Sequence, residues 1–188
     1  MSSHSGHIRI IGGQWARRRL PVAPVPGLRP TGDRMRETLF NWLQFELPGA
    51  RVLDAFAGTG ALGLEALSRG AAQAVFVERH PKAVRQLQTN LHTLKAQGAQ
   101  LVHTDTLRYL GGAPEPFDII FVDPPFAEQL QQAVVERLAA GWVRPGGWVY
   151  VEQPRAQALP QVPDHWSLHR DKAAGQVRYL LYHTGEAE

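Results

Sequence analysis

Cysteine is absent from the 188 residues of this chain. The absence excludes disulfide bonds, thiolate zinc sites and cysteine nucleophiles, and with them a secreted disulfide scaffold. Long apolar runs are missing too: none approaches the roughly 20 residues that span a bilayer, and the first residues lack the apolar core of a signal peptide. We therefore expect a soluble, cytoplasmic, globular protein that has no membrane partner.

The net charge is small, at +3, but it is distributed unevenly along the chain. Residues 1–36 contain seven arginines and one acid, a net charge of +6, whereas residues 37–188 contain 13 basic and 16 acidic residues, a net charge of −3. A basic segment on a mildly acidic body indicates a polyanionic partner, although an arginine-rich solvated surface has the same composition. Arginines in such a segment could bind the phosphates of a nucleic acid without reading its sequence.

The chain begins with a predicted arm of residues 1–32. Isoleucine alternates with arginine from Ile8, and two glycines then permit a turn, which predicts a β-hairpin whose return strand begins at Gln14 and Trp15. Four prolines between residues 21 and 30 predict an extended connector, because proline has no N–H to donate within a helix or sheet.

Residues 33–188 form the predicted main domain, in which helices and strands alternate. Leucine at every fourth position predicts a helix from Asp33 to Glu46. The patterns then predict strands at 52–53, 74–77, 101–102, 118–122 and 148–152, and helices at 60–68, 81–98 and 129–140. This order predicts an α/β, Rossmann-like, doubly wound and mostly parallel sheet. Residues 166–170 and 177–182 flank a turn and predict an antiparallel C-terminal hairpin that brings the sheet to seven strands.

A glycine-rich loop follows the first strand of this domain. Gly58, Gly60 and Gly63 match the G-x-G-x-x-G pattern, in which glycine lets the backbone approach a ligand and the start of a helix offers unpaired N–H groups. Glu78 ends the next strand, where a carboxylate can accept both hydroxyls of a ribose. The pattern predicts an adenosine-type cofactor, which on these residues alone is either NAD or S-adenosylmethionine.

Asp54, just before the glycines, favours S-adenosylmethionine, because a carboxylate would repel a pyrophosphate but suits a cationic amino-acid group. Asp105 follows the third strand and either accepts from the adenine amine or caps the helix that starts after it. The expected product of this cofactor is S-adenosylhomocysteine, and no metal is required. The candidate cofactor-binding residues are Asp54, Phe56, Gly58, Gly60, Glu78, Asp105 and Asp123.

The sequence Asp123-Pro124-Pro125-Phe126 follows the fourth strand and supplies the candidate catalytic residues. Two prolines fix a rigid turn, so we expect the Asp123 carboxylate and the Pro124 carbonyl to face the cleft. Two acceptors that hold the hydrogens of a planar amine would free its lone pair and stabilise the developing positive charge, while Phe126 stacks on the base. Direct transfer to an amine also agrees with the absence of cysteine, which excludes a covalent thiolate route.

Several motifs together resemble the RsmD family of methyltransferases. They are Ile8–Trp15, Leu28–Thr31, Arg36–Asn41, Asp54–Ser68, Asp123–Phe126 and Gly175–Val177. The resemblance implies transfer of a methyl group from S-adenosylmethionine to the exocyclic amine, N2, of one guanine in 16S ribosomal RNA within a small-subunit assembly intermediate. It also implies that the helix carrying Arg36 and Glu37 folds over the cofactor.

The expected RNA contacts follow from the basic arm and from this resemblance, and they are Arg9, Trp15, Arg17, Arg18, Arg19, Arg29 and Arg36. We expect a monomer without a stable protein partner. On the residues alone, other functions stay open: methylation of DNA adenine or of a protein glutamine, a nicotinamide-dependent oxidoreductase, and RNA binding without catalysis.

Overall fold

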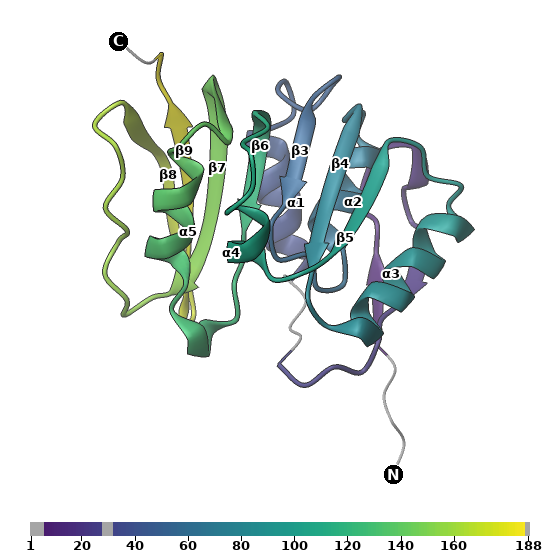
Figure 1. Cartoon of the computed structure of the whole chain (residues 1–188). Helices are drawn as coiled ribbons and strands as arrows, with labels where there is room; N and C mark the ends of the chain where they lie inside the picture. Colours follow the sequence, from purple (N-terminus) through teal and green to yellow (C-terminus); the bar gives the residue numbers. More distant parts are fainter. Residues whose placement is uncertain (1–5, 28–31, 187–188) are drawn as a thin grey trace.

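A computed structural model describes residues 6–27 and 32–186 of the chain. Its main sheet contains β3 (Arg51–Asp54), β4 (Gln73–Glu78), β5 (Ala99–His103), β6 (Phe117–Val122), β7 (Val143–Pro154), β8 (Trp166–Ala174) and β9 (Val177–Thr184). These strands lie in the order β5-β4-β3-β6-β7-β9-β8 (Figure 1). Pairing is parallel from β5 to β7, and β9 runs antiparallel to both β7 and β8. The predicted doubly wound sheet with an antiparallel C-terminal hairpin is confirmed.

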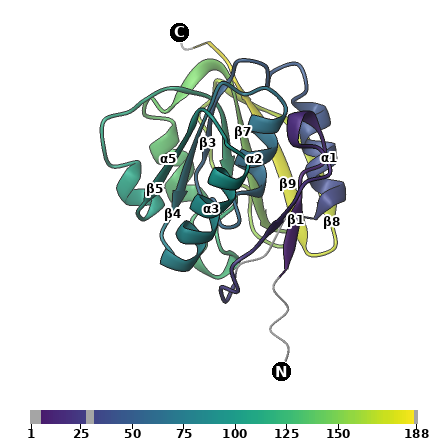
Figure 2. The same ribbon diagram turned by 90° about the vertical axis from the view of Figure 1, so that its right-hand side faces the viewer.

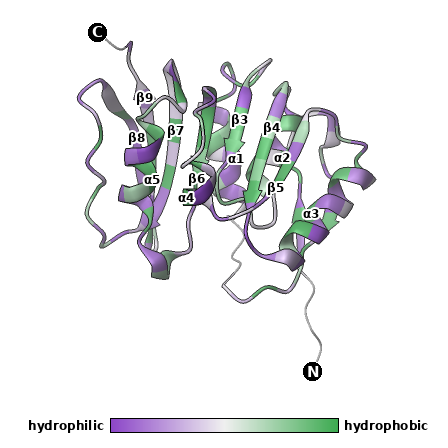
Figure 3. Ribbon diagram, viewed as in Figure 1, coloured by the Kyte–Doolittle hydropathy of each residue, from purple (hydrophilic) through white to green (hydrophobic). Residues whose placement is uncertain are grey.

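Helices cover both faces of this sheet, each over its own apolar core. Side chains of α1 (Asp33–Trp42), α2 (Ala61–Ser68) and α3 (Pro81–Thr93) share one core, and those of α4 (Thr106–Tyr109) and α5 (Gln131–Leu138) belong to the other. Figure 2 shows α1 and α5 on opposite sides of the strands. The central strands β4 and β6 are mainly hydrophobic (Figure 3), as strands buried on both faces must be.

The N-terminal hairpin is confirmed, but the return strand begins later than predicted. β1 (His7–Arg9) pairs with β2 (Arg19–Pro21), and the segment Gly13–Trp15 between them is a 3₁₀ turn. The turn forms because Trp15 is buried in the core and its N–H donates to the Ser68 hydroxyl at 3.0 Å. Long-range packing against α2 therefore overrides the strand that was predicted to begin at Gln14.

Other boundaries differ for similar reasons. The helix predicted to reach residue 46 ends at Trp42, yet Leu43 and Leu47 stay buried in the turns that follow. The four-residue spacing of leucines therefore predicted which side chains are buried, but not where the helix ends. The separation of an arm of residues 1–32 from the main domain stays a prediction. Across the described parts of the chain, no helix combines the length and the apolar character needed to span a membrane.

Candidate active site

A cavity of about 590 Å³ lies where the loops leave the carboxyl ends of β3, β4 and β6. Open α/β sheets bind ligands at this edge, and the volume is within the usual range for small-molecule sites. The cavity is lined by residues from both predicted sets: Asp54, Phe56, Gly58, Glu78 and Asp105 from the cofactor set, and Asp123, Pro124, Pro125 and Phe126 from the catalytic set. Residues separated by about 70 positions in the sequence thus face one space.

Asp54 ends β3 and is almost completely buried, with 2% of its surface exposed. Its Oδ2 accepts from the Gly63 N–H at 3.0 Å, which ties the strand to the first turns of α2. Burial raises the pKa of the Asp54 carboxyl to about 7; the nearby charge of Glu78 adds to the rise, and the hydrogen bond from Gly63 opposes it. A ligand cation beside Asp54 would favour the ionised carboxylate, so the site fits a cationic amino group.

Glu78, at the end of β4, organises the glycine loop. One of its oxygens accepts from the Gly58 N–H at 2.6 Å, and the other accepts from the N–H groups of Arg79 and His80, each at 3.0 Å. The carboxylate lines the cavity while it makes these bonds. Oε1 already accepts two hydrogen bonds, but the other oxygen, Oε2, accepts only one and keeps a lone pair, so Glu78 can also accept from a ribose hydroxyl.

Two of the three motif glycines serve packing. A Cβ at Gly60 would lie 2.4 Å from the Leu87 Cδ1, and a Cβ at Gly63 would lie 2.3 Å from the Phe76 Cε1. Gly60 also has a positive φ of 83° at the start of α2, a conformation that favours glycine. Gly60 is not among the residues that line the cavity, so it shapes the loop instead of forming the wall that Gly58 forms.

Asp105 caps a helix and also lines the cavity. Its Oδ2 accepts from the Arg108 N–H at 3.2 Å, which confirms the helix cap on α4. The same side chain is exposed and lines the cavity. A contact between Asp105 and an adenine amine stays a prediction.

The candidate catalytic turn lies directly after β6. Pro124 is buried, Asp123 and Phe126 are partly buried, and Pro125 is exposed. Phe126 begins a 3₁₀ turn, η2 (Phe126–Glu128), that continues along the cavity. All four residues of the turn therefore line the same cavity as the cofactor loop.

The cavity has walls that the sequence did not reveal. Arg79, after β4, forms an ion pair with Glu128 of η2, and both residues line the cavity. Val25, Pro26 and Gly27 of the proline-rich connector line it as well. The pairing of Arg79 with Glu128 could not be predicted from charge alone, because the two residues are 49 positions apart. The prolines of the connector predicted an extended segment but not its position beside the cavity.

Comparison with known proteins identifies the family. A family model described as "Conserved hypothetical protein 95" matches residues 8–183. The "Ribosomal RNA small subunit methyltransferase D" of Escherichia coli (strain K12) is 52% identical over 181 residues, 96% of this chain and 91% of that protein. The chain belongs to the RsmD family.

Solved structures agree with this membership. That of yhhF from Escherichia coli has a TM-score of 0.90 and 48% sequence identity, and the match covers 96% of this chain and 99% of that one. The structure of SMU.776 complexed with SAH matches at a TM-score of 0.74 and 14% identity, over 97% of this chain and 57% of that one. At that identity the similarity shows the fold alone.

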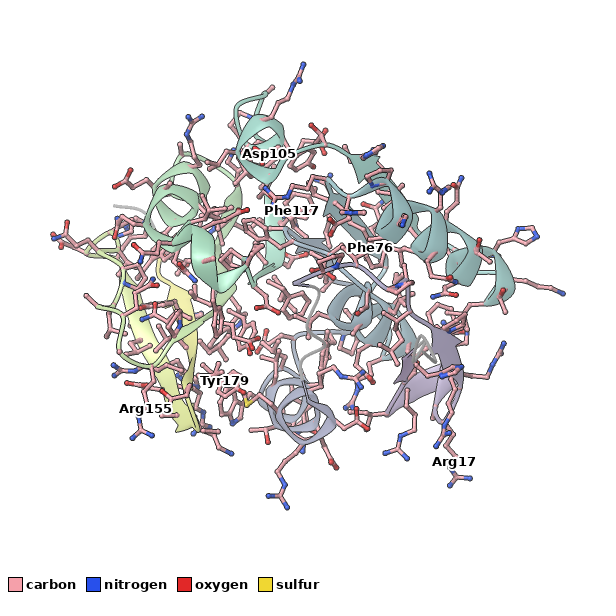
Figure 4. All side chains as sticks on the ribbon, turned by 90° about the horizontal axis from the view of Figure 1, so that it is seen from below. Arg17, Phe76, Asp105, Phe117, Arg155 and Tyr179 are labelled. Atoms are coloured by element: carbon pink, nitrogen blue, oxygen red, sulfur yellow. The ribbon has the colours of Figure 1, made fainter. Side chains whose placement is uncertain are left out.

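In this RsmD-family chain the arm presents only part of the predicted RNA-binding set. Arg9, Arg17, Arg18 and Arg19 are exposed, and Figure 4 shows Arg17 at the periphery of the molecule, with its side chain directed outward. Arg9 also lies 3.6 Å from Asp33 in an exposed ion pair. Arg29 lies outside the described residues, and its contact stays a prediction.

Arg36 and Trp15 correct the sequence-based prediction. Arg36 is only 2% exposed: its guanidinium bonds to Asp33 at 2.6 Å and lies 3.5 Å from the buried Glu65 carboxylate. Trp15 is 8% exposed and packs in the core. Neither side chain can reach an RNA phosphate or base while these contacts persist, so the prediction that they bind RNA is wrong. Glu37, next to Arg36, is exposed on α1.

Glu65 is the residue that sequence reasoning missed. Its carboxylate is fully buried and accepts from the N–H groups of Ile11 and Gly12, at 2.8 and 2.9 Å, and from the Arg69 Nε at 2.9 Å. It thereby fixes the N-terminal hairpin to α2, the helix that begins at the cofactor loop. The available signal was one acid within an eight-residue helix that is otherwise apolar except for Ser68.

Proposed function

We propose that this protein transfers a methyl group from S-adenosylmethionine to the exocyclic amine, N2, of a guanine in 16S ribosomal RNA, within an assembly intermediate of the small ribosomal subunit. The observation that carries the proposal is the single cavity lined by both Asp54 and the turn Asp123–Phe126. An acid for a cationic cofactor thus lies beside acceptors for a planar amine. The 52% identity to a protein named as a small-subunit ribosomal RNA methyltransferase supports the substrate class.

The residues of the cavity fit this cofactor. The ionised Asp54 carboxylate would hold the ammonium group, Glu78 would accept from the ribose hydroxyls, and Asp105 would accept from the adenine amine. Bound S-adenosylmethionine supplies a methyl group on a sulfonium, and it leaves as S-adenosylhomocysteine. Since Glu78 already fixes the Gly58 backbone, the loop is organised before any ligand arrives.

The catalytic turn acts on the amine of the base. The Asp123 carboxylate and the Pro124 carbonyl accept the two N–H hydrogens, which favours a pyramidal nitrogen whose lone pair can attack the methyl carbon. The N–C bond forms as the S–C bond breaks, and the electron pair of that bond goes to sulfur. The nitrogen is then positively charged, and Asp123 is placed to stabilise that charge and accept the proton that leaves. Phe126 stacks on the base and aims it.

The exposed arginines of the arm complete the proposal. A base in a helix must leave its stack before an enzyme can modify it, and RNA loops present such bases at the lowest cost. Arg9, Arg17, Arg18 and Arg19 would bind phosphates and hold the RNA in register while the target base enters the cavity. Arg29 would join them.

A substitution of Asp123 tests the proposal. For Asp123→Ala we expect a loss of at least about 100-fold in the rate of methyl transfer to unmethylated small-subunit particles, on the scale of removing one group that stabilises a transition-state charge. Binding of S-adenosylhomocysteine, measured by calorimetry, should change by no more than a few-fold. Glu136→Ala, which removes an exposed carboxylate from α5, is the matched control and should change neither quantity.

Survival of turnover in Asp123→Ala would refute the assigned chemistry. Transfer to DNA adenine or to a protein glutamine, in place of ribosomal RNA, would retain the chemistry and refute the substrate. Tighter binding of NAD than of S-adenosylhomocysteine would instead support the oxidoreductase alternative.

A further inference from the structure

The C-terminal hairpin contains a strand that is exposed almost throughout. In β8, every residue from Ser167 to Ala174 is exposed, whereas its partner β9 is mostly buried. A strand exposed on both faces adds little to the core. Its sequence includes Arg170 and Lys172, which makes it a charged edge of the sheet.

The register places this strand level with the catalytic turn. Lys172 pairs with Tyr179, and Tyr179 pairs with Glu152 on β7. Glu152 follows Val151, whose partner on β6 is Val122, the residue before Asp123. Asp123 and Lys172 are thus separated by three strand spacings of about 4.8 Å, or about 14 Å in total. Both lie at the end of the sheet where the parallel strands finish.

The cations of this region lie on surfaces that RNA can reach. Because cross-strand partners share a face, Lys172 lies on the same face as Tyr179, and the Arg170 guanidinium lies 5.9 Å from the Trp42 ring on the α1 side. Arg155 is held beside the hairpin turn, since its N–H donates to the Gln176 carbonyl at 2.7 Å. The neighbouring acid, Asp171, is neutralised by a two-bond pair with Arg178.

We name Arg155, Arg170 and Lys172 the C-terminal basic cluster. Figure 4 shows Arg155 and Arg17 projecting from opposite sides of the molecule, in a view from below Figure 1. The carboxyl ends of the parallel strands, and with them the candidate catalytic turn, lie between these two sides (Figure 1). An RNA strand with a base in the cavity can therefore reach the N-terminal arm in one direction and the C-terminal basic cluster in the other.

We propose that the C-terminal basic cluster is a second RNA-binding surface, which binds phosphates of the ribosomal RNA on the side of the target base opposite the N-terminal arm. This inference rests on the proposed function. Two phosphate-binding surfaces that flank the cavity would fix the direction of the RNA as well as its position. The competing explanation is that charge on β8 only prevents edge-to-edge pairing with other strands.

The test compares Arg170→Gln/Lys172→Gln with wild type in binding to unmethylated 16S ribosomal RNA at several salt concentrations. For a single strand, each phosphate that a protein cation neutralises contributes about 0.7 to the slope of log affinity against log salt, so the slope of the double variant should be smaller by about 1.4. The KM for small-subunit particles should rise while kcat stays unchanged, because neither side chain contacts the reacting atoms. Lys95→Gln/Arg137→Gln, which removes two exposed cations elsewhere, is the matched control.

Each outcome is decisive. An unchanged slope and KM in the cluster variant, with an active wild type, would overturn the second surface and leave the proposed function intact. An effect on particles without an effect on naked RNA would also overturn it, in favour of a contact with a ribosomal protein. An equal decrease in the control variant would show a nonspecific charge effect and overturn it as well. An inactive wild type would instead count against the proposed function.

Discussion

Ionisation of Asp54 should control cofactor binding in the physiological pH range. The carboxyl is buried and its pKa is about 7 in the free protein, so much of it is protonated at neutral pH. A cationic ammonium group binds the carboxylate and not the acid, so binding must release the proton. With this pKa, about ten in eleven molecules are protonated at pH 6 and about one in eleven at pH 8. The affinity should therefore be about tenfold weaker at pH 6 than at pH 8.

The same ionisation should also appear in the stability of the free protein. The folded-state pKa of about 7 is above the ordinary value of 3.8, so the folded protein retains a proton that the unfolded chain has already released. The free energy of unfolding therefore falls as pH rises between these values, by about 4 kcal/mol in total and about 2 kcal/mol between pH 5 and pH 7. The substitution Asp54→Asn removes this cost, so the variant should gain stability relative to wild type at pH 8 while it loses cofactor affinity.

Calorimetric titration with S-adenosylhomocysteine at pH 6, 7 and 8, at constant ionic strength, checks the binding, and urea unfolding at pH 5 and 8 checks the stability. Asp54→Asn should bind weakly and with little pH dependence. His80 also lines the cavity, so His80→Asn is the control and should keep the wild-type dependence. A wild-type affinity that is constant from pH 6 to 8, or a dependence that persists in Asp54→Asn, would refute the reasoning.

Other contacts give further predictions. Glu78→Gln removes the charge that holds the Gly58 N–H and that we propose binds the ribose, so calorimetry should show binding of S-adenosylhomocysteine weakened by about 10- to 100-fold; unchanged binding would contradict the role of Glu78. Glu65→Gln removes the buried charge that pairs with both Arg36 and Arg69, and urea unfolding should show a loss of about 3–5 kcal/mol; a loss below about 1 kcal/mol would contradict the anchoring role. Gly13→Ala should cost about 1–3 kcal/mol in the same assay, because Gly13 has a φ of 79° and a Cβ would lie 1.9 Å from a backbone oxygen of α2; wild-type stability would show that the hairpin is not docked there.

The sheet could be predicted because its strands are set by local patterns. The apolar run of β6, the glycine loop after β3 and the turn at Asp123 each carry their signal within about ten residues. The carboxyl ends of parallel strands meet at one edge, so the strand order alone brought Asp54, Glu78 and Asp123 together. Local pattern and topology were sufficient for most of the cavity.

The N-terminal arm could not be predicted as well, because distant contacts decide it. From the sequence, Trp15 could be a strand residue or an RNA contact. Its position is decided by Ser68, 53 positions away, whose hydroxyl accepts from the Trp15 N–H. Arg36 looks like one more cation of a basic segment, yet the buried Glu65 holds it inside. Charge counted along a sequence gives the sign of a segment, but only packing decides which charges face the solvent.

The most direct test of the central claim is the identity of the methylated product. The purified protein should be incubated with labelled S-adenosylmethionine and with small-subunit particles that lack this methylation, and the ribosomal RNA should then be digested to nucleosides and analysed by mass spectrometry. We predict that the label appears in a single N2-methylguanosine of 16S ribosomal RNA and is absent when Asp123→Ala replaces the wild type. Label on another base, or no transfer to the RNA by the active wild-type protein, would contradict the account.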